Sequence, residues 1–129
     1  MKNMSEELAI KVIEAINDRD RDLIEPLTTE DVQLRLPIGE VYYGRAGIRG
    51  FFDQLEKMLP DLTLAARKVY TCEHFAIVEY EAAGHSPKLA PKEESMGVLI
   101  LELDGNGRKK VARAQLYLDT AHWQTLTGG

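Results

Sequence analysis

A long hairpin near the end of the sequence is the feature that most constrains what this chain can fold into. Apolar residues dominate 95–103, and an alternating segment follows at 108–119. Between them, Asp104-Gly105-Asn106-Gly107 contains two residue pairs that favour the positive φ angles of a tight turn. The second strand alternates between two faces: Ala112, Ala114, Leu116 and Leu118 against Arg113, Gln115, Tyr117 and Asp119. Because a hairpin of this length is stable only against a further apolar surface, the rest of the chain is expected to supply one.

Length, charge and cysteine content narrow the classes of protein that fit. A chain of 129 residues with 44% hydrophobic residues is expected to form a single domain, residues 1–129, with a buried core. Its net charge of −5 argues against nucleic acids and anionic membrane surfaces as partners. The lone cysteine, Cys72, excludes an internal disulfide and suits a reducing compartment. The sequence has neither the apolar core of a signal peptide nor an apolar run long enough to span a bilayer, so a cytoplasmic protein is expected.

Hydrophobic periodicity indicates helices first and strands afterwards. The expected helices cover 5–16, a short segment at 23–27, and 45–59, where Pro60 ends the last one. The expected strands cover 32–36, 41–43, 61–71 and 75–85, followed by the loop Ser86–Glu94 and the hairpin. Helices followed by strands are typical of an α+β domain in which the helices pack on one face of a curved sheet.

Four segments also have the order and spacing of a known family. They are Ile16-Asn17 before Asp20–Ile24, Leu36-Pro37-Ile38-Gly39, the glycine-containing stretch Gly44–Phe52, and the ending Tyr117-Leu118-Asp119. Together they resemble the NTF2-like superfamily, and in particular its SnoaL-like and ketosteroid-isomerase-like group, over nearly the whole chain. The resemblance implies a cone-shaped α+β fold with three N-terminal helices packed on a strongly curved, mostly antiparallel sheet around a pocket. It also implies a homodimer that forms through the outer face of the sheet.

The isomerase chemistry of that group does not carry over. A ketosteroid isomerase combines an aspartate base with an oxyanion hole made of a tyrosine and a protonated acid. The matching positions here hold Leu36 for the base, Val12 for the tyrosine and Leu99 for the acid. None of these side chains moves a proton or donates a hydrogen bond to a developing enolate. The resemblance therefore implies the scaffold without the isomerase machinery, and ketosteroid isomerase activity is not expected.

The same substitutions predict an apolar pocket wall. If the leucines and the alanine of the inner sheet face all point inward, the wall suits an apolar ligand that is held by shape and desolvation. The predicted ligand-binding residues are Val12, Leu34, Leu36, Tyr43, Phe52, Leu99, Leu101, Ala114 and Leu116. The alternative is that these side chains fill the space and form a solid core. Side-chain volume in the sequence does not decide between the two.

Two polar residues are the candidates for acid/base chemistry. Asp119 ends the last strand, where SnoaL-like members often carry an aspartate, but it is equally suited to cap a tail helix at 120–126. His85 ends the strand expected at 75–85 and resembles a histidine of SnoaL-like proteins, but it also fits a solvated position at the start of a loop. Tyr43 would orient the ligand through its phenol group.

Two functions remain compatible with these patterns. The first is a SnoaL-like protein that binds or transforms a small hydrophobic molecule; as an enzyme it would be a cofactor-independent acid/base isomerase, cyclase or hydrolase. The second is a non-catalytic dimerisation or protein-interaction module that uses the outer sheet face, with Arg113, Gln115, Tyr117, Glu102, Val98 and Ile100. Three scattered histidines without metal-ligand spacing predict no metal site, and no cofactor motif is present.

Overall fold

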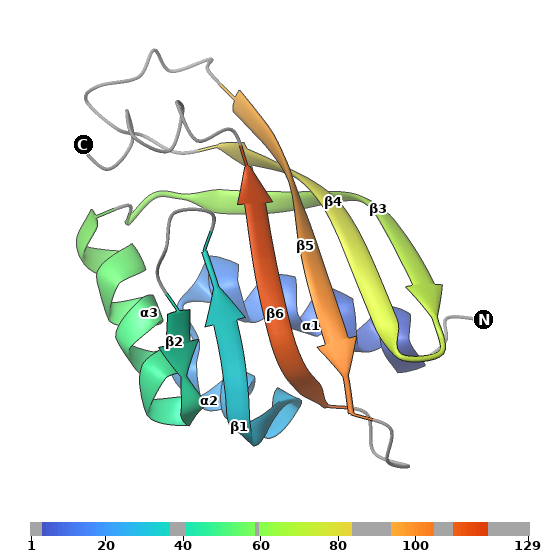
Figure 1. Cartoon of the computed structure of the whole chain (residues 1–129). Coiled ribbons are helices and arrows are strands. Elements are labelled where there is room, and N and C mark those ends of the chain that lie inside the picture. The colour runs from blue at the N-terminus through green and yellow to red at the C-terminus, as the bar shows by residue number, and fades with distance from the viewer. Residues whose placement is uncertain (1–3, 37–40, 59, 84–93, 105–109, 119–129) are drawn as a thin grey trace.

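The protein combines three α-helices with one sheet in the computed structural model, which describes residues 4–36, 41–58, 60–83, 94–104 and 110–118 (Figure 1). The helices are α1 (Met4–Asp18), α2 (Arg21–Ile24) and α3 (Gly44–Met58), and a short 3-10 turn, η1 (Glu25–Leu27), follows α2. The strands are β1 (Thr28–Arg35), β2 (Val41–Tyr43), β3 (Thr63–Cys72), β4 (Phe75–Ala83), β5 (Glu94–Leu103) and β6 (Val111–Leu118). The α+β class and the predicted order of these elements are confirmed.

The strands form one six-stranded sheet in the order β2-β1-β6-β5-β4-β3. All neighbours pair antiparallel except β1 and β6, which lie side by side in parallel. The sheet is therefore mixed but mostly antiparallel, as predicted. The parallel pairing brings the chain's first strand against its last strand, and it was not part of the sequence prediction.

The predicted hairpin is formed by β5 and β6. The two strands pair from Gly97 opposite Leu118 to Leu103 opposite Val111. Just beyond, the Asp104 amide donates to the Lys110 carbonyl at 2.9 Å, and the Lys110 amide donates to Asp104 Oδ1 at 2.9 Å. The turn glycines lie outside the described residues. These contacts close the hairpin where the sequence predicts.

The alternation predicted for β6 is wrong at its first residue. A bulge in the β5–β6 pairing places Val111 opposite Leu103 and Arg113 opposite Glu102, so Ala112 is the extra residue. Val111 is consequently buried, whereas Ala112 is only half-buried. Ala114 and Leu116 face the core, as expected, and Tyr117 is exposed.

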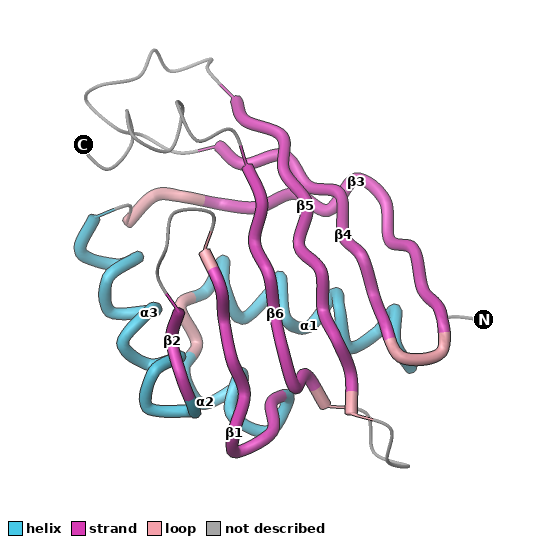
Figure 2. The backbone as a smooth tube through the Cα atoms, in the orientation of Figure 1, coloured by secondary structure: helices cyan, strands magenta, loops and turns pink. Residues whose placement is uncertain are grey.

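The helices cover one face of the sheet; Figure 2 shows α1 behind the strands and α3 beside β2. Helix α1 packs against β3 and β4, and α3 packs against β1 and β2. The buried stripe of α1 comprises Ser5, Leu8, Ala9, Val12, Ile13, Ala15 and Ile16, at the spacing of a helix face. The Asn17 side chain fixes the end of α1 to β3, because it donates to the Leu64 carbonyl at 2.9 Å and accepts from the Leu64 amide at 2.7 Å. The core thus lies between the helices and the inner sheet face.

None of the described helices is both long and apolar enough to cross a membrane.

Candidate functional site

A cavity of about 70 Å³ lies inside this core. Every α-helix contributes to its lining, and so do β1, β3, β4, β5 and β6. The lining residues are Val12, Ile16, Ile24, Thr28, Val32, Leu34, Ile48, Phe51, Phe52, Leu55, Leu62, Leu64, Tyr80, Ala82, Leu99, Leu101, Val111, Ala114 and Leu116. Nearly all of these side chains are hydrocarbon, and none carries a charge.

The structure brings most of the predicted ligand-binding residues to this cavity. Those that line it are Val12, Leu34, Phe52, Leu99, Leu101, Ala114 and Leu116. Leu36 is buried at 7% exposure but is not part of the lining. The two acid/base candidates, Asp119 and His85, lie outside the described residues, as does most of the loop at 86–94.

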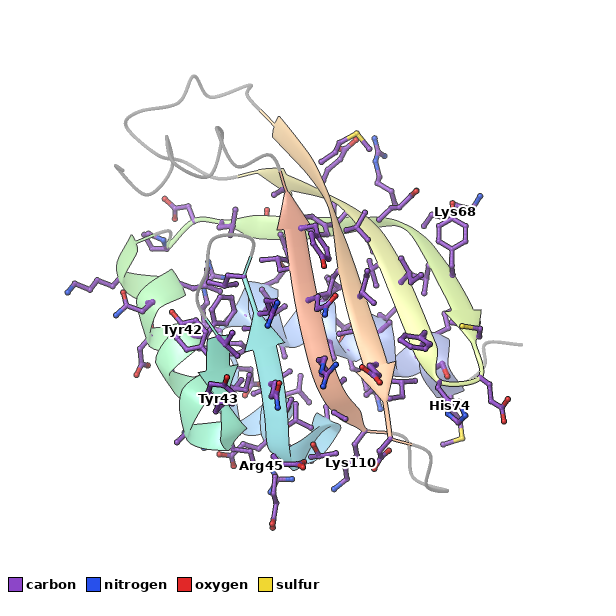
Figure 3. All side chains as sticks on the ribbon, viewed as in Figure 1. Tyr42, Tyr43, Arg45, Lys68, His74 and Lys110 are labelled. Atoms are coloured by element: carbon purple, nitrogen blue, oxygen red, sulfur yellow. The ribbon has the colours of Figure 1, made fainter. Side chains whose placement is uncertain are left out.

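Tyr43, like Leu36, lies away from the cavity that it was predicted to line. It is the last residue of β2, its side chain is 66% exposed, and it does not line the cavity. Tyr42 instead packs on the core, with its ring 5.6 Å from the ring of Phe51 in an edge-on arrangement. Figure 3 labels both tyrosines on β2, beside α3. Since successive strand residues point to opposite faces, only one of the pair can face inward.

The sequence analysis missed two hydroxyl-bearing residues of the cavity. Tyr80 on β4 is 1% exposed, and its hydroxyl donates to the Tyr117 carbonyl of β6 at 3.0 Å. Thr28 is 3% exposed, and its hydroxyl donates to the Glu25 carbonyl at 3.0 Å. Both protons are therefore directed at backbone carbonyls. The feature that could have indicated the role of Tyr80 is Gly97, which lies opposite it in the β4–β5 pairing. That pairing is known only once the strand register is known.

Gly97 makes the position of Tyr80 possible. In the β4–β5 pairing Tyr80 lies opposite Gly97, and its ring crosses β5 to reach β6. A Cβ atom on residue 97 would lie 2.4 Å from the Tyr80 hydroxyl and 2.3 Å from the Tyr117 carbonyl oxygen. Such distances are far shorter than van der Waals contact. Residue 97 must therefore be glycine because the Tyr80 ring and the β6 backbone approach it closely, and not because of a turn.

Burial also fixes the protonation state of Tyr80. Removal from water disfavours the phenolate and raises the pKa of Tyr80 well above its usual value of 10.0. The phenol therefore stays neutral at physiological pH. Among the described lining residues there is no carboxylate, imidazole or thiol. This part of the cavity can hold an apolar group by shape, but it supplies no acid or base.

We expect Tyr80→Phe to make the fold less sensitive to alkaline pH. Because the folded pKa lies above the unfolded one, the neutral phenol stabilises the fold fully below pH 10.0, and this contribution is lost as the pH rises through the folded value. At neutral pH the free energy of unfolding of the variant should be lower by about 1 kcal/mol, because the hydrogen bond to the Tyr117 carbonyl is lost. Urea unfolding at about pH 7, 9 and 11 measures both effects. The control is Tyr43→Phe at an exposed position; equal pH dependence in Tyr80→Phe and the unaltered protein would contradict the expectation.

Ion pairs hold one end of the cavity together. Arg21 of α2 pairs with Asp53 and with Glu56 of α3, the latter at 2.7 Å, and Arg49 of α3 pairs with Glu25 of η1 at 2.6 Å. These contacts keep α2 and η1, which bring Ile24 to the lining and lead into Thr28, against α3. The pairs are largely exposed, so they fix position more than they add stability.

The described residues contain no cluster of three or more His, Cys, Asp or Glu side chains that could hold a metal ion.

Comparison with known proteins shows which family and which folds this chain resembles. The sequence matches the family model of the SnoaL-like domain over residues 9–114. An NTF2-like protein of unknown function from Burkholderia pseudomallei has a TM-score of 0.85 at 16% identity, over 99% of this chain and 100% of its own. TerC, co-crystallised with polyporic acid, has a TM-score of 0.81 at 20% identity, over 95% and 97% of the two chains.

A further solved structure, a putative SnoaL-like polyketide cyclase from Shewanella denitrificans, has a TM-score of 0.77 at 14% identity, over 99% of this chain and 100% of its own. At these identities the three structures show that the fold is NTF2-like. No curated protein matches the sequence.

Proposed function

The chain belongs to the SnoaL-like domain family, and we propose that it binds or transforms a small apolar molecule in the cavity between its helices and its sheet. The observation that carries the proposal is the hydrocarbon wall, which includes Leu99 and Val12, two of the positions where a ketosteroid isomerase holds its catalytic groups. The same leucine and valine argue against ketosteroid isomerase activity. Gly44, Gly47 and Gly50 lack the lysine of a phosphate loop, so this stretch does not support a nucleotide cofactor, and we propose a cofactor-free protein.

The apolar lining of the cavity indicates which class of ligand it favours. An apolar group gains about 25 cal/mol for each Å² that leaves water, whereas a polar group without a partner loses several kcal/mol. The Tyr80 and Thr28 hydroxyls already donate to backbone carbonyls, so the described wall offers a polar ligand little in return. An uncharged, hydrocarbon-rich molecule therefore fits this cavity best.

The size of the cavity sets a second condition. Its 70 Å³ is about half of the roughly 150 Å³ that holds benzene in an engineered apolar cavity, and well below the roughly 300–1,000 Å³ of typical ligand pockets. A ligand as large as benzene therefore requires the lining side chains to move apart. Leucine side chains such as Leu99 and Leu101 can change rotamer to make that space.

The solved neighbours support a small-molecule ligand. TerC was crystallised with polyporic acid, and the Shewanella denitrificans protein is named as a putative polyketide cyclase. We include polyketide-type compounds among the candidate ligands of this chain. If the protein is an enzyme, we propose Asp119 and His85 as its acid and base, in a cofactor-independent isomerase, cyclase or hydrolase.

Native mass spectrometry of the purified protein tests the proposal. We expect a species that carries the added mass of a small molecule. The matched variant is Ala114→Leu, which fills the cavity from β6 with a larger side chain of the same chemistry. It should fold and lose the added mass. Retention of the same mass by both proteins would contradict binding in this cavity.

A homodimer through the outer sheet face is the second proposal, and exposed apolar side chains favour it. Tyr70, Phe75, Met96 and Tyr117 are each 39% to 64% exposed. On this face Ile77 of β4 lies opposite Ile100 of β5, at the centre of the sheet. Burial of such a row against a second copy would give the apolar interface core of a stable dimer. This face would equally serve a non-catalytic interaction module.

Ile100→Glu tests the dimer. Ile100 lies between the buried Leu99 and Leu101, so its side chain points away from the cavity. A charge at the centre of the interface should convert the dimer to a monomer in the same mass spectra, without loss of the bound ligand. A variant that stays dimeric would exclude this face as the interface.

Two further proposals concern the shape of the sheet and the location of the protein. We propose a cone around the cavity, because irregularities in the β1–β6, β3–β4 and β5–β6 pairings increase the local twist of the sheet. We propose a cytoplasmic location, because the exposed thiol of Cys72 persists in a reducing compartment.

A further inference from the structure

A polar groove of about 220 Å³ lies on the outer face of the sheet, opposite the apolar cavity. It is lined by Gln33, Arg35, Val41, Arg113 and Gln115, from β1, β2 and β6. In the parallel β1–β6 pairing Gln33 lies beside Arg113, and Arg35 lies beside Gln115. Two guanidinium groups and two carboxamides therefore alternate across neighbouring strands. Leu34 and Ala114, between them on the same strands, point inward to the cavity.

The positive charge of this groove is poorly balanced. None of the described residues that line it is an acid, although the chain as a whole carries a net charge of −5. Arg113 has one acid neighbour, Glu102, at 3.7 Å between Nη1 and Oε2, with both side chains about half exposed. Within the described ranges the Arg35 guanidinium has neither an acid partner nor a hydrogen-bond acceptor. The groove thus presents donor groups that no described acceptor uses.

One of the carboxamides is already oriented for an acceptor. The Tyr117 hydroxyl donates to Gln115 Oε1 at 3.0 Å. This bond uses the carbonyl end of the amide and leaves both hydrogens of Nε2 to donate elsewhere. Gln115 lies beside Arg35, so the amide hydrogens and the guanidinium, neither of which has an acceptor among the described residues, belong to the same corner of the groove.

We propose that this groove binds the carboxylate of a small organic acid, with Arg35 as its principal partner. A planar guanidinium forms paired hydrogen bonds with a planar carboxylate, and an ionised acceptor strengthens each bond. Val41 lies opposite Arg35 in the β1–β2 pairing and gives the groove an apolar wall for the hydrocarbon part of the ligand. The site is separate from the cavity, and a failure of either proposal leaves the other standing.

Titration of the isotope-labelled protein with sodium benzoate tests the site. The side-chain amide signals of Gln33 and Gln115 report binding directly in a proton–nitrogen correlation spectrum. We expect saturable shifts of these signals with benzoate and none with benzamide, which has the same shape without the charge. Arg35→Gln should weaken binding about tenfold, because it removes the charge-assisted pair, and Arg113→Gln should weaken it as well. The control is Arg67→Gln, which removes the same charge from the β3 ion pair with Glu81.

Three results would overturn the proposal. The first is an equal response to benzamide, which would show that the charge is not recognised. The second is an equal loss of affinity in Arg67→Gln and Arg35→Gln, which would show only a general effect of net charge. The third is binding of inorganic phosphate as tightly as benzoate, which would exclude a site that selects carboxylates.

Discussion

Gly97→Ala is expected to lower the free energy of unfolding by about 3 kcal/mol or more, a large effect for one added methyl group. The new Cβ would lie 2.3 Å from the Tyr117 carbonyl oxygen and 2.5 Å from Cζ of the Tyr80 ring. The carbonyl belongs to the backbone of β6, and the Tyr80 ring is fully buried on the inner face of the sheet. Relief therefore requires a shift of a strand or the loss of the bond from Tyr80 to Tyr117.

Urea unfolding of two matched alanine variants measures this effect. Gly50, in the middle of α3, has no atom within 4 Å of the position a Cβ would take. Gly50→Ala should raise the free energy of unfolding by about 0.5–1 kcal/mol through helix propensity alone. The two substitutions are thus expected to differ in sign. Similar small effects at both positions would show that Tyr80 does not need the space above residue 97.

Leu101→Ala is expected to lower the free energy of unfolding by about 2–5 kcal/mol and to create a site for benzene. Leu101 has no exposed surface and lines the cavity from β5. Its truncation removes apolar contacts and enlarges a space that already measures 70 Å³. An enlarged cavity with a hydrocarbon wall stays dry and accepts an apolar guest, so benzene should restore part of the lost stability.

Thermal unfolding with and without benzene measures both parts of this expectation. The matched control is Ile100→Ala, one residue away on the outer face, where the side chain is only half-buried. Ile100→Ala should lower the free energy of unfolding by less than Leu101→Ala does, and benzene should not stabilise the Ile100→Ala variant. A benzene effect of the same size in both variants would mean that the guest does not occupy the cavity.

Local sequence patterns predicted the helices and strands of this fold because each pattern depends only on residues that are close together in the sequence. The stripe of α1 and the Asp-Gly and Asn-Gly pairs of the hairpin act over a few residues, and the structure contains a helix and a hairpin at these places. Contacts between distant segments have no such signal. The parallel pairing of β1 with β6 and the bulge that buries Val111 depend on how strands meet in space.

The candidate site shows the same division. Inward positions such as Leu34 and Leu101 follow from alternation within long strands, and both line the cavity. The three residues of β2 are all apolar, so no alternation indicates that Tyr42 rather than Tyr43 faces the core. The role of Tyr80 depends on Gly97 in the next strand and on a carbonyl one strand further. A single strand's pattern does not contain that information.

Xenon binding, followed by methyl NMR under gas pressure, tests the central proposal most directly. Xenon is apolar and small enough for a cavity that is half the size of a benzene site. We predict saturable shifts of the methyl signals of Val12, Leu99 and Leu101, which line the cavity, and none for Val98 and Ile100 on the outer face. Absence of shifts at the lining methyls, or equal shifts on both faces, would show a filled core and contradict a ligand-binding cavity.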